Sequence, residues 1–103
     1  MEEAEIKASA DQCIERFGRL DMLFNNAGAG TLSSVEEVTQ TEFRNAMDLL
    51  VGSVVFGMKH ATPIMKEQGF GRIINNSSVA AIRTHMGGYL YSGAKAAVSQ
   101  LTR

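Results

Sequence analysis

A long helical pattern lies between two short strand-like segments, and this arrangement constrains the fold more than any other feature. Residues 20–24 are almost entirely apolar, and residues 72–76 contain adjacent β-branched side chains at Ile73 and Ile74. Between them, residues 40–67 carry apolar side chains at three- and four-residue steps, which is typical of an amphipathic helix. Two strands joined by a long crossover helix pair in parallel, with a right-handed connection. The sequence therefore predicts a parallel strand–helix–strand unit, with strands that we expect to be buried on both faces.

Two further helical patterns flank this unit. Residues 2–18 repeat apolar side chains at helical spacing and end at Gly18, a favourable helix stop, and residues 89–103 have similar periodicity. Thr39, with a glutamate three residues later, predicts the start of the long helix, whereas Pro63 is expected to kink that helix or end it early. The fold class predicted is α/β, as a partial Rossmann-like doubly wound parallel sheet with two central strands and three main helices.

Composition argues against several classes of function. The 103 residues have a formal net charge of −1 and no run of like charge, so attraction to nucleic acid is not expected. No apolar run approaches the roughly 18 residues of a membrane span. The single cysteine, Cys13, cannot form an internal disulfide, which fits a reducing compartment and predicts a cytoplasmic protein. His60 and His85 lack metal-ligand spacing, so no metal site is predicted, and His60 is expected to face solvent.

Polar residues follow both predicted strands, at the sheet edge where ligands bind in open α/β folds. Residues 25–30 read Asn-Asn-Ala-Gly-Ala-Gly, in which asparagines can hold a turn open and glycines allow a ligand to approach closely. Ser77 and Ser78 follow the second strand, and either hydroxyl could bind a substrate oxygen. Ordinary turns that contain asparagine or serine are the alternative at both places.

Tyr91 and Lys95 stand four residues apart on the last predicted helix, so their side chains share a face. A free tyrosine has a pKa of about 10, and a nearby ammonium lowers it by favouring the phenolate. Such a pair could exchange a proton with a hydroxyl or carbonyl group at neutral pH. An incidental surface pair is the alternative, because tyrosine and lysine occur often at this spacing.

Together these stretches resemble the short-chain dehydrogenase/reductase family, over essentially the whole chain. The run Asn25-Asn26-Ala27-Gly28 is similar to the Asn-Asn-Ala-Gly motif of that family. Tyr91 and Lys95 match its Tyr-x-x-x-Lys motif, whereas Tyr89 does not, because a glycine stands four residues after it. Each motif alone is weak, but their order and spacing make the resemblance specific.

The resemblance implies a role for each of these residues. Ser78, which lies 91 − 78 = 13 positions before Tyr91 and is preferred to Ser77 on this spacing, would hold the substrate carbonyl or hydroxyl. Tyr91 would be the general acid/base, and Lys95 would lower its pKa and bind the nicotinamide ribose. The cofactor cleft would be lined by Asn26, Ala27 and Gly28. The implied reaction is reversible hydride transfer between NAD or NADP and a small-molecule alcohol or ketone.

The sequence also departs from the family pattern. It contains neither the N-terminal Gly-rich turn that holds the cofactor pyrophosphate nor the C-terminal strands, so residues 1–103 are expected to be a partial NAD(P)-binding Rossmann domain. We therefore expect the chain to be inactive as it stands. Leu50 occupies the position of an asparagine that usually serves a proton relay, and Ser53 that of a small glycine.

The resemblance further implies a homo-oligomer that associates through the helices at residues 40–67 and 89–103. Two other functions stay open at this point. One is a non-catalytic, dimerising interaction module, and the other is a degenerate nucleotide binder, suggested by Leu50.

Overall fold

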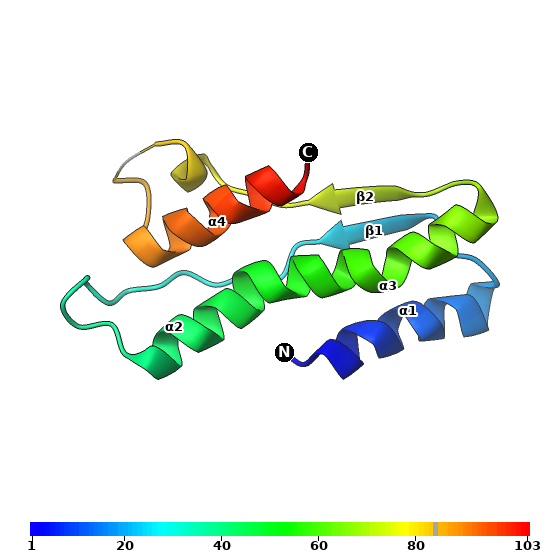
Figure 1. Ribbon diagram of the computed structural model, residues 1–103, viewed down its shortest axis with the longest axis horizontal. Helices are drawn as coiled ribbons and strands as arrows, with labels where there is room; N and C mark the ends of the chain where they lie inside the picture. The colour runs from blue at the N-terminus through cyan, green and yellow to red at the C-terminus, as the bar shows by residue number, and fades with distance from the viewer. Residues whose placement is uncertain (84) are drawn as a thin grey trace.

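The elements follow one another in the predicted order of helix, strand, helix, strand and helix (Figure 1). The computed structural model describes residues 1–83 and 85–103. Its elements are α1 (Glu3–Phe17), β1 (Met22–Asn25), α2 (Gln40–Met47), the π-helical turn η1 (Asp48–Gly52), α3 (Ser53–Gln68), β2 (Arg72–Asn75), the short 3₁₀ helix η2 (Val79–Ala81) and α4 (Tyr89–Leu101).

The two strands pair in parallel, as the crossover helix predicts. Met22 lies opposite Arg72 and Asn25 opposite Asn75, so both strands end at the same level. This register brings the polar stretches after the two strands to one edge of the sheet.

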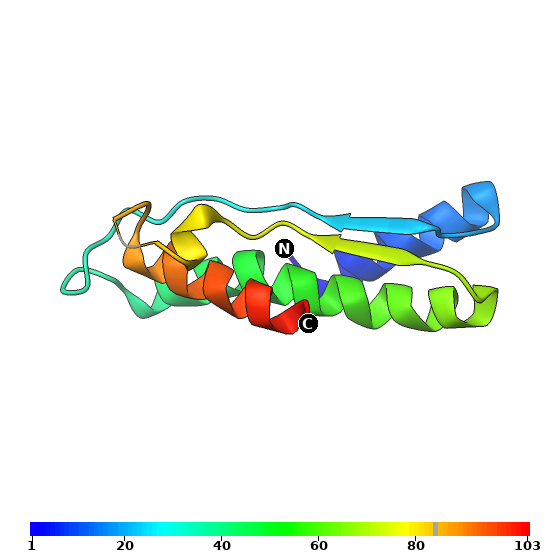
Figure 2. The same ribbon diagram turned by 90° about the horizontal axis from the view of Figure 1, so that it is seen from above.

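Only one face of the sheet is covered by helices. Leu23 and Ile73 pack against a buried cluster formed by Leu20 with Ala61 and Met65 of α3. On the opposite face, the exposed fractions of Met22, Phe24 and Ile74 are 60%, 57% and 46%. The expectation that both faces are buried is therefore wrong for this chain, because α3 lies beneath one face and α1 runs alongside α3 (Figures 1 and 2).

The long helical segment is continuous from α2 through η1 to α3. It begins where predicted, since the Thr39 side chain accepts a hydrogen bond from the Glu42 N–H. Pro63 does not end it early, because α3 continues to Gln68. Pro63 and Lys59, whose carbonyl would face the proline, are both exposed, so water can solvate that carbonyl. The irregular point is instead η1, where the Ser53 N–H donates to the Asp48 carbonyl five residues back.

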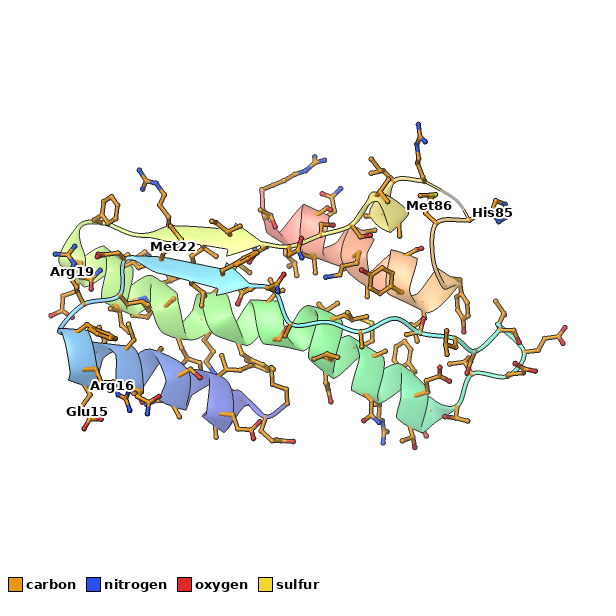
Figure 3. All side chains as sticks on the ribbon, turned by 180° about the vertical axis from the view of Figure 1, so that it is seen from behind. Glu15, Arg16, Arg19, Met22, His85 and Met86 are labelled. Atoms are coloured by element: carbon orange, nitrogen blue, oxygen red, sulfur yellow. The ribbon has the colours of Figure 1, made fainter. Side chains whose placement is uncertain are left out.

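Helix α1 packs along α3 and ends at Gly18, whose φ of 75° is the left-handed conformation that glycine favours. Glu15 and Arg16 lie on the outward side of α1 and point into solvent (Figure 3). At the other end, the Glu3 carboxylate accepts a hydrogen bond from Lys59 and contacts His60 Nε2 at 2.9 Å. His60 is therefore mostly covered, with a side chain 16% exposed, and the prediction that it faces solvent is wrong. Within residues 1–83 and 85–103, no helix combines the length and apolar character that crossing a membrane requires.

Candidate active site

Paired asparagines join the carboxyl ends of β1 and β2. Asn25 Nδ2 donates to Asn75 Oδ1 at 2.8 Å, and Asn76 Nδ2 donates to Asn26 Oδ1 at 2.7 Å. The Asn76 N–H also donates to the Asn25 carbonyl at 3.0 Å, which extends the parallel ladder by one residue. The structure has no turn at residues 25–30, where the sequence predicts one, because the chain continues from β1 without a bend. The hydrogen bonds hold this segment, residues 25–30, beside the one that leads to Ser78. The two polar stretches that the sequence singled out therefore form one site.

The two adjacent asparagines have different surroundings. Asn25, the last residue of β1, is half-buried and lies against Gly57 of α3, where an added Cβ would overlap its side-chain amide. Asn26 is exposed at the sheet edge. Asn25 thus anchors the end of β1 to the helix, while Asn26 remains accessible to a ligand.

Lys95 is buried, with only 4% of the residue exposed, and its ammonium points back at the end of β2. Its Nζ donates to the Asn76 carbonyl at 2.8 Å. A buried charge is costly unless it is hydrogen-bonded, and this bond compensates part of that cost. Asn76 therefore binds Lys95 through its backbone and Asn26 through its side chain, so that one residue links both halves of the site.

Tyr91 and Lys95 share a face of α4, as their spacing predicts. Lys95 Nζ lies 5.8 Å from the centre of the Tyr91 ring. Tyr91 also packs against the buried cluster that contains Leu50 and Ala94, which holds the ring in place. Tyr89, in the first turn of the same helix, is 43% exposed. The two tyrosines therefore have different surroundings.

The two adjacent serines make different contacts. Ser77 Oγ donates to the Lys95 carbonyl at 2.9 Å and lies 2.7 Å from Ser99 Oγ, so it ties the end of β2 to α4. Ser78 Oγ accepts a hydrogen bond from the Ala80 N–H at 3.1 Å and caps η2. An accepted bond leaves the hydroxyl proton of Ser78 free to be donated. Ser77 is therefore engaged in joining β2 to α4, whereas the Ser78 hydroxyl still has a proton to donate.

Gly28 brings the segment of residues 25–30 next to Lys95. A Cβ added to Gly28 would lie 3.7 Å from Lys95 Nζ and 3.3 Å from Leu50 Cδ2. Leu50 is almost completely buried, with 1% exposed, and belongs to the π-helical turn η1. The absence of a side chain at Gly28 leaves room beside the ammonium, and Leu50 presents an apolar surface there instead of a polar group.

Sequence reasoning missed two contributors to this site. Asn76 lies in the polar stretch predicted at the end of the second strand, but its hydrogen bonds with Asn26 and Lys95 depend on strand register. Thr31 was not singled out, yet its Oγ1 accepts a hydrogen bond from the Tyr91 N–H at 3.2 Å. No local pattern reveals that bond, since the two residues are 60 positions apart in the sequence.

Residues 85–88 form the end of the loop that leads into α4. Gly87 lies against Tyr91, where an added Cβ would stand 3.3 Å from Tyr91 Cδ1 and 3.5 Å from the Ala80 Cβ. This contact brings η2, which begins after Ser78, close to Tyr91. His85 stands at the outer edge of the loop and points away from α4 (Figure 3), with a φ of 61°.

Known proteins are similar to this chain in both sequence and fold. The family model described as short chain dehydrogenase matches residues 1–103. Levodione reductase of Leifsonia aquatica is 38% identical over 103 residues, which cover 99% of this chain and 39% of that protein. The crystal structure of levodione reductase matches with a TM-score of 0.90 and 35% identity, over 99% of this chain and 40% of the other.

Two further solved structures match with slightly lower TM-scores and lower sequence identity. NAD+-bound xylitol dehydrogenase has a TM-score of 0.88 at 28% identity, over 98% of this chain and 39% of its own. ElxO with NADP bound has a TM-score of 0.88 at 30% identity, over 97% of this chain and 41% of its own. The predicted partial Rossmann-like α/β fold is confirmed by these likenesses. This chain thus spans 39% of the length of levodione reductase. Since the family model matches every residue from 1 to 103, the chain belongs to the short-chain dehydrogenase family.

Proposed function

We propose that this chain is the catalytic segment of an NAD(P)-dependent oxidoreductase that interconverts a small-molecule alcohol and its ketone. The observation that carries the proposal is the buried Lys95 ammonium, held by the Asn76 carbonyl at 2.8 Å and 5.8 Å from the centre of the Tyr91 ring. A covered cation beside a phenol, at the ligand-binding edge of a parallel sheet, is suited to proton transfer.

In this proposal, Tyr91 is the general acid/base and Ser78 positions the substrate. In the reducing direction, the Tyr91 hydroxyl gives its proton to the substrate oxygen, while Ser78 donates a hydrogen bond to the same oxygen. In the oxidising direction, Tyr91 takes the proton back. The nicotinamide, when bound, supplies or accepts the hydride. Lys95 stabilises negative charge on the phenolic oxygen of Tyr91.

The residues that directly follow β1 fit a flat, polar cofactor. Asn26 is exposed at the sheet edge, and Gly28 leaves space beside Lys95 Nζ that any side chain would fill. An ammonium has three N–H donors, and the Asn76 carbonyl takes one of them, which leaves donors for a ribose hydroxyl. We therefore propose that Asn26, Ala27 and Gly28, together with Tyr91 and Lys95, bind NAD or NADP. The two solved relatives that carry NAD+ and NADP support both cofactors equally.

We also propose that residues 1–103 form a partial NAD(P)-binding domain without turnover of its own. A pyrophosphate needs a helix N-terminus preceded by a Gly-rich turn, and this sequence has no such turn after a strand. One apolar face of the two-stranded sheet is also exposed, because the helices cover the other face. Oxidation of NAD(P)H by the isolated chain with any ketone, lost on Tyr91→Phe, would overturn this part of the proposal.

The catalytic assignment is tested in a chimaera in which residues 1–103 replace the matching segment of levodione reductase. General acid/base catalysis contributes about 10²–10⁴-fold, so we expect Tyr91→Phe to lower kcat by at least about a hundredfold. Tyr89→Phe is the matched control, because it also removes a phenolic hydroxyl from α4, but at an exposed position. It should leave kcat unchanged. NAD(P)H absorbance gives the rate. A folded chimaera that is inactive, or one that keeps its rate with Tyr91→Phe, contradicts the proposal.

A non-catalytic, self-associating module is the second candidate function. Exposed apolar side chains on the long helices favour it, namely Phe43, Val55 and Leu101, which are 49%, 37% and 41% exposed. Self-association through these helices is compatible with catalysis, so the Tyr91→Phe comparison separates the two functions. We further propose a cytoplasmic location, because a lone thiol is suited to a reducing compartment.

A further inference from the structure

Helix α4 begins without a capping side chain of its own. Its N-cap residue is Gly88, and Tyr91 is the third helical residue, whose N–H points out of the helix end without an intrahelical acceptor. Where the N-cap residue is serine, threonine, aspartate or asparagine, its side-chain oxygen commonly accepts a hydrogen bond from the N–H of the second or third helical residue. Here the acceptor is Thr31 Oγ1, at 3.2 Å, from a loop 60 residues earlier.

The fit between Thr31 and Gly88 is a second, independent observation. A Cβ added to Gly88 would lie 2.5 Å from the Thr31 carbonyl oxygen and 2.8 Å from Thr31 Oγ1. The φ of Gly88 is −60°, which any residue adopts, so glycine is needed here for space and not for backbone freedom. Thr31 therefore occupies the volume in which an ordinary N-cap side chain would stand.

The location of Thr31 gives this cap a further consequence. Thr31 stands three residues after Gly28, directly after the segment of residues 25–30 that contacts Lys95. The residue whose N–H it binds is Tyr91 itself. One hydroxyl thus connects the segment proposed to bind the cofactor with the backbone of the proposed general acid/base.

We propose that Thr31 is a positioning residue, an N-cap supplied from another part of the chain, which fixes the position of Tyr91 relative to the segment that contains Gly28. Its bearing on catalysis rests on the role proposed above for Tyr91. The hydroxyl of Thr31 acts on the backbone of Tyr91 and touches no reacting atom. A cap that serves stability alone would leave the Tyr91 ring where it is, and this difference can be measured.

The experiment uses NMR of the ¹⁵N-labelled 103-residue chain. Thr31→Val keeps the shape of the side chain and removes the hydroxyl, whereas Thr31→Ser keeps the hydroxyl. The first measurement is amide hydrogen exchange at Tyr91, referenced to Ser92, whose N–H is bound inside the helix to the Gly88 carbonyl at 2.9 Å. The second is the set of cross-peaks between the Tyr91 ring and the α protons of Gly87, which lie in contact.

We expect Thr31→Val to speed Tyr91 exchange relative to Ser92 by about fivefold, the factor that corresponds to one N-cap hydrogen bond. We also expect it to weaken the cross-peaks between the Tyr91 ring and Gly87, and Thr31→Ser to restore both. Gly88→Ala, which displaces Thr31 without altering it, should reproduce the effect of Thr31→Val.

Two results overturn the proposal. In the wild-type chain, a Tyr91 N–H that exchanges as fast as the preceding Leu90 N–H shows that the cap does not form, and this measurement needs no variant. If Thr31→Val speeds exchange but leaves the ring cross-peaks unchanged, the role is structural only. Neither measurement needs cofactor or turnover, so this proposal and the catalytic assignment of Tyr91 can fail separately.

Discussion

Replacing each of the two adjacent serines by alanine tests the roles proposed for them, Ser77 in stability and Ser78 in substrate binding. Ser77→Ala removes the bond to the Lys95 carbonyl at 2.9 Å and the contact with Ser99 Oγ at 2.7 Å, both in a half-buried position. Ser78→Ala removes the bond from the Ala80 N–H, which caps a helix of only three residues. We therefore expect Ser77→Ala to lower mainly the stability of the chain, and Ser78→Ala to lower mainly the activity.

The contacts set the size of each effect. A net hydrogen bond contributes about 1 kcal/mol, so Ser77→Ala should lower the unfolding free energy by about 2 kcal/mol and Ser78→Ala by about 1 kcal/mol or less. For a domain of about 100 residues, 1 kcal/mol corresponds to about 4–8 °C in Tm. The expected decreases in Tm are then about 10 °C for Ser77→Ala and about 5 °C or less for Ser78→Ala.

Thermal unfolding followed by circular dichroism measures these shifts in the 103-residue chain. In the levodione reductase chimaera, Ser78→Ala should lower kcat by about a hundredfold, because it removes a donor to the substrate oxygen. Ser77→Ala should keep kcat within about tenfold at a temperature where the protein is folded. A larger loss of Tm for Ser78→Ala than for Ser77→Ala, or a larger loss of kcat for Ser77→Ala, would show that the two roles are exchanged.

Two further predictions concern charged groups. Among the described residues, Lys95 is paired with a carbonyl and not with a carboxylate. Lys95→Met should therefore leave Tm unchanged or raise it, while abolishing activity in the chimaera. A Tm loss of more than about 10 °C would contradict this expectation. The pKa of Glu3 is lowered from 4.5 by its hydrogen bond to Lys59 and, less strongly, by the adjacent imidazole. The stabilisation that this lowered pKa represents is present above pH 4.5 and is lost as pH falls through the lower, folded-state value. Thermal unfolding over this acid range should show a smaller loss of Tm for Glu3→Gln than for the wild type, whereas Glu15→Gln on the exposed side of α1 should behave like the wild type.

Periodicity was sufficient to predict the order and the pairing of the elements. Apolar spacing in residues 40–67 specifies a crossover helix, and a crossover of that length requires parallel strands. The same local geometry put Tyr91 and Lys95 on one face of α4, because residues four apart on a helix are neighbours. These features depend on contacts within an element or on chain connectivity, so a sequence is enough to predict them.

Packing between distant segments decided the rest. The different environments of Ser77 and Ser78 depend on where α4 lies against the end of β2, and periodicity places both serines in the same loop. The covered position of His60 depends on α1 packing along α3. The exposed face of the sheet has a similar origin, since an apolar strand sequence cannot specify which of its faces a helix will cover.

The sequence by itself therefore determined the fold class and the juxtaposition of Tyr91 and Lys95 on one helix face. Only the tertiary structure decided that Asn76 holds Lys95 and that Thr31 caps the helix at Tyr91. The physical reason is the length of chain between the partners. Local patterns report neighbours within a few residues, whereas the second of these hydrogen bonds joins groups 60 positions apart, which meet only when the sheet and its helices have packed.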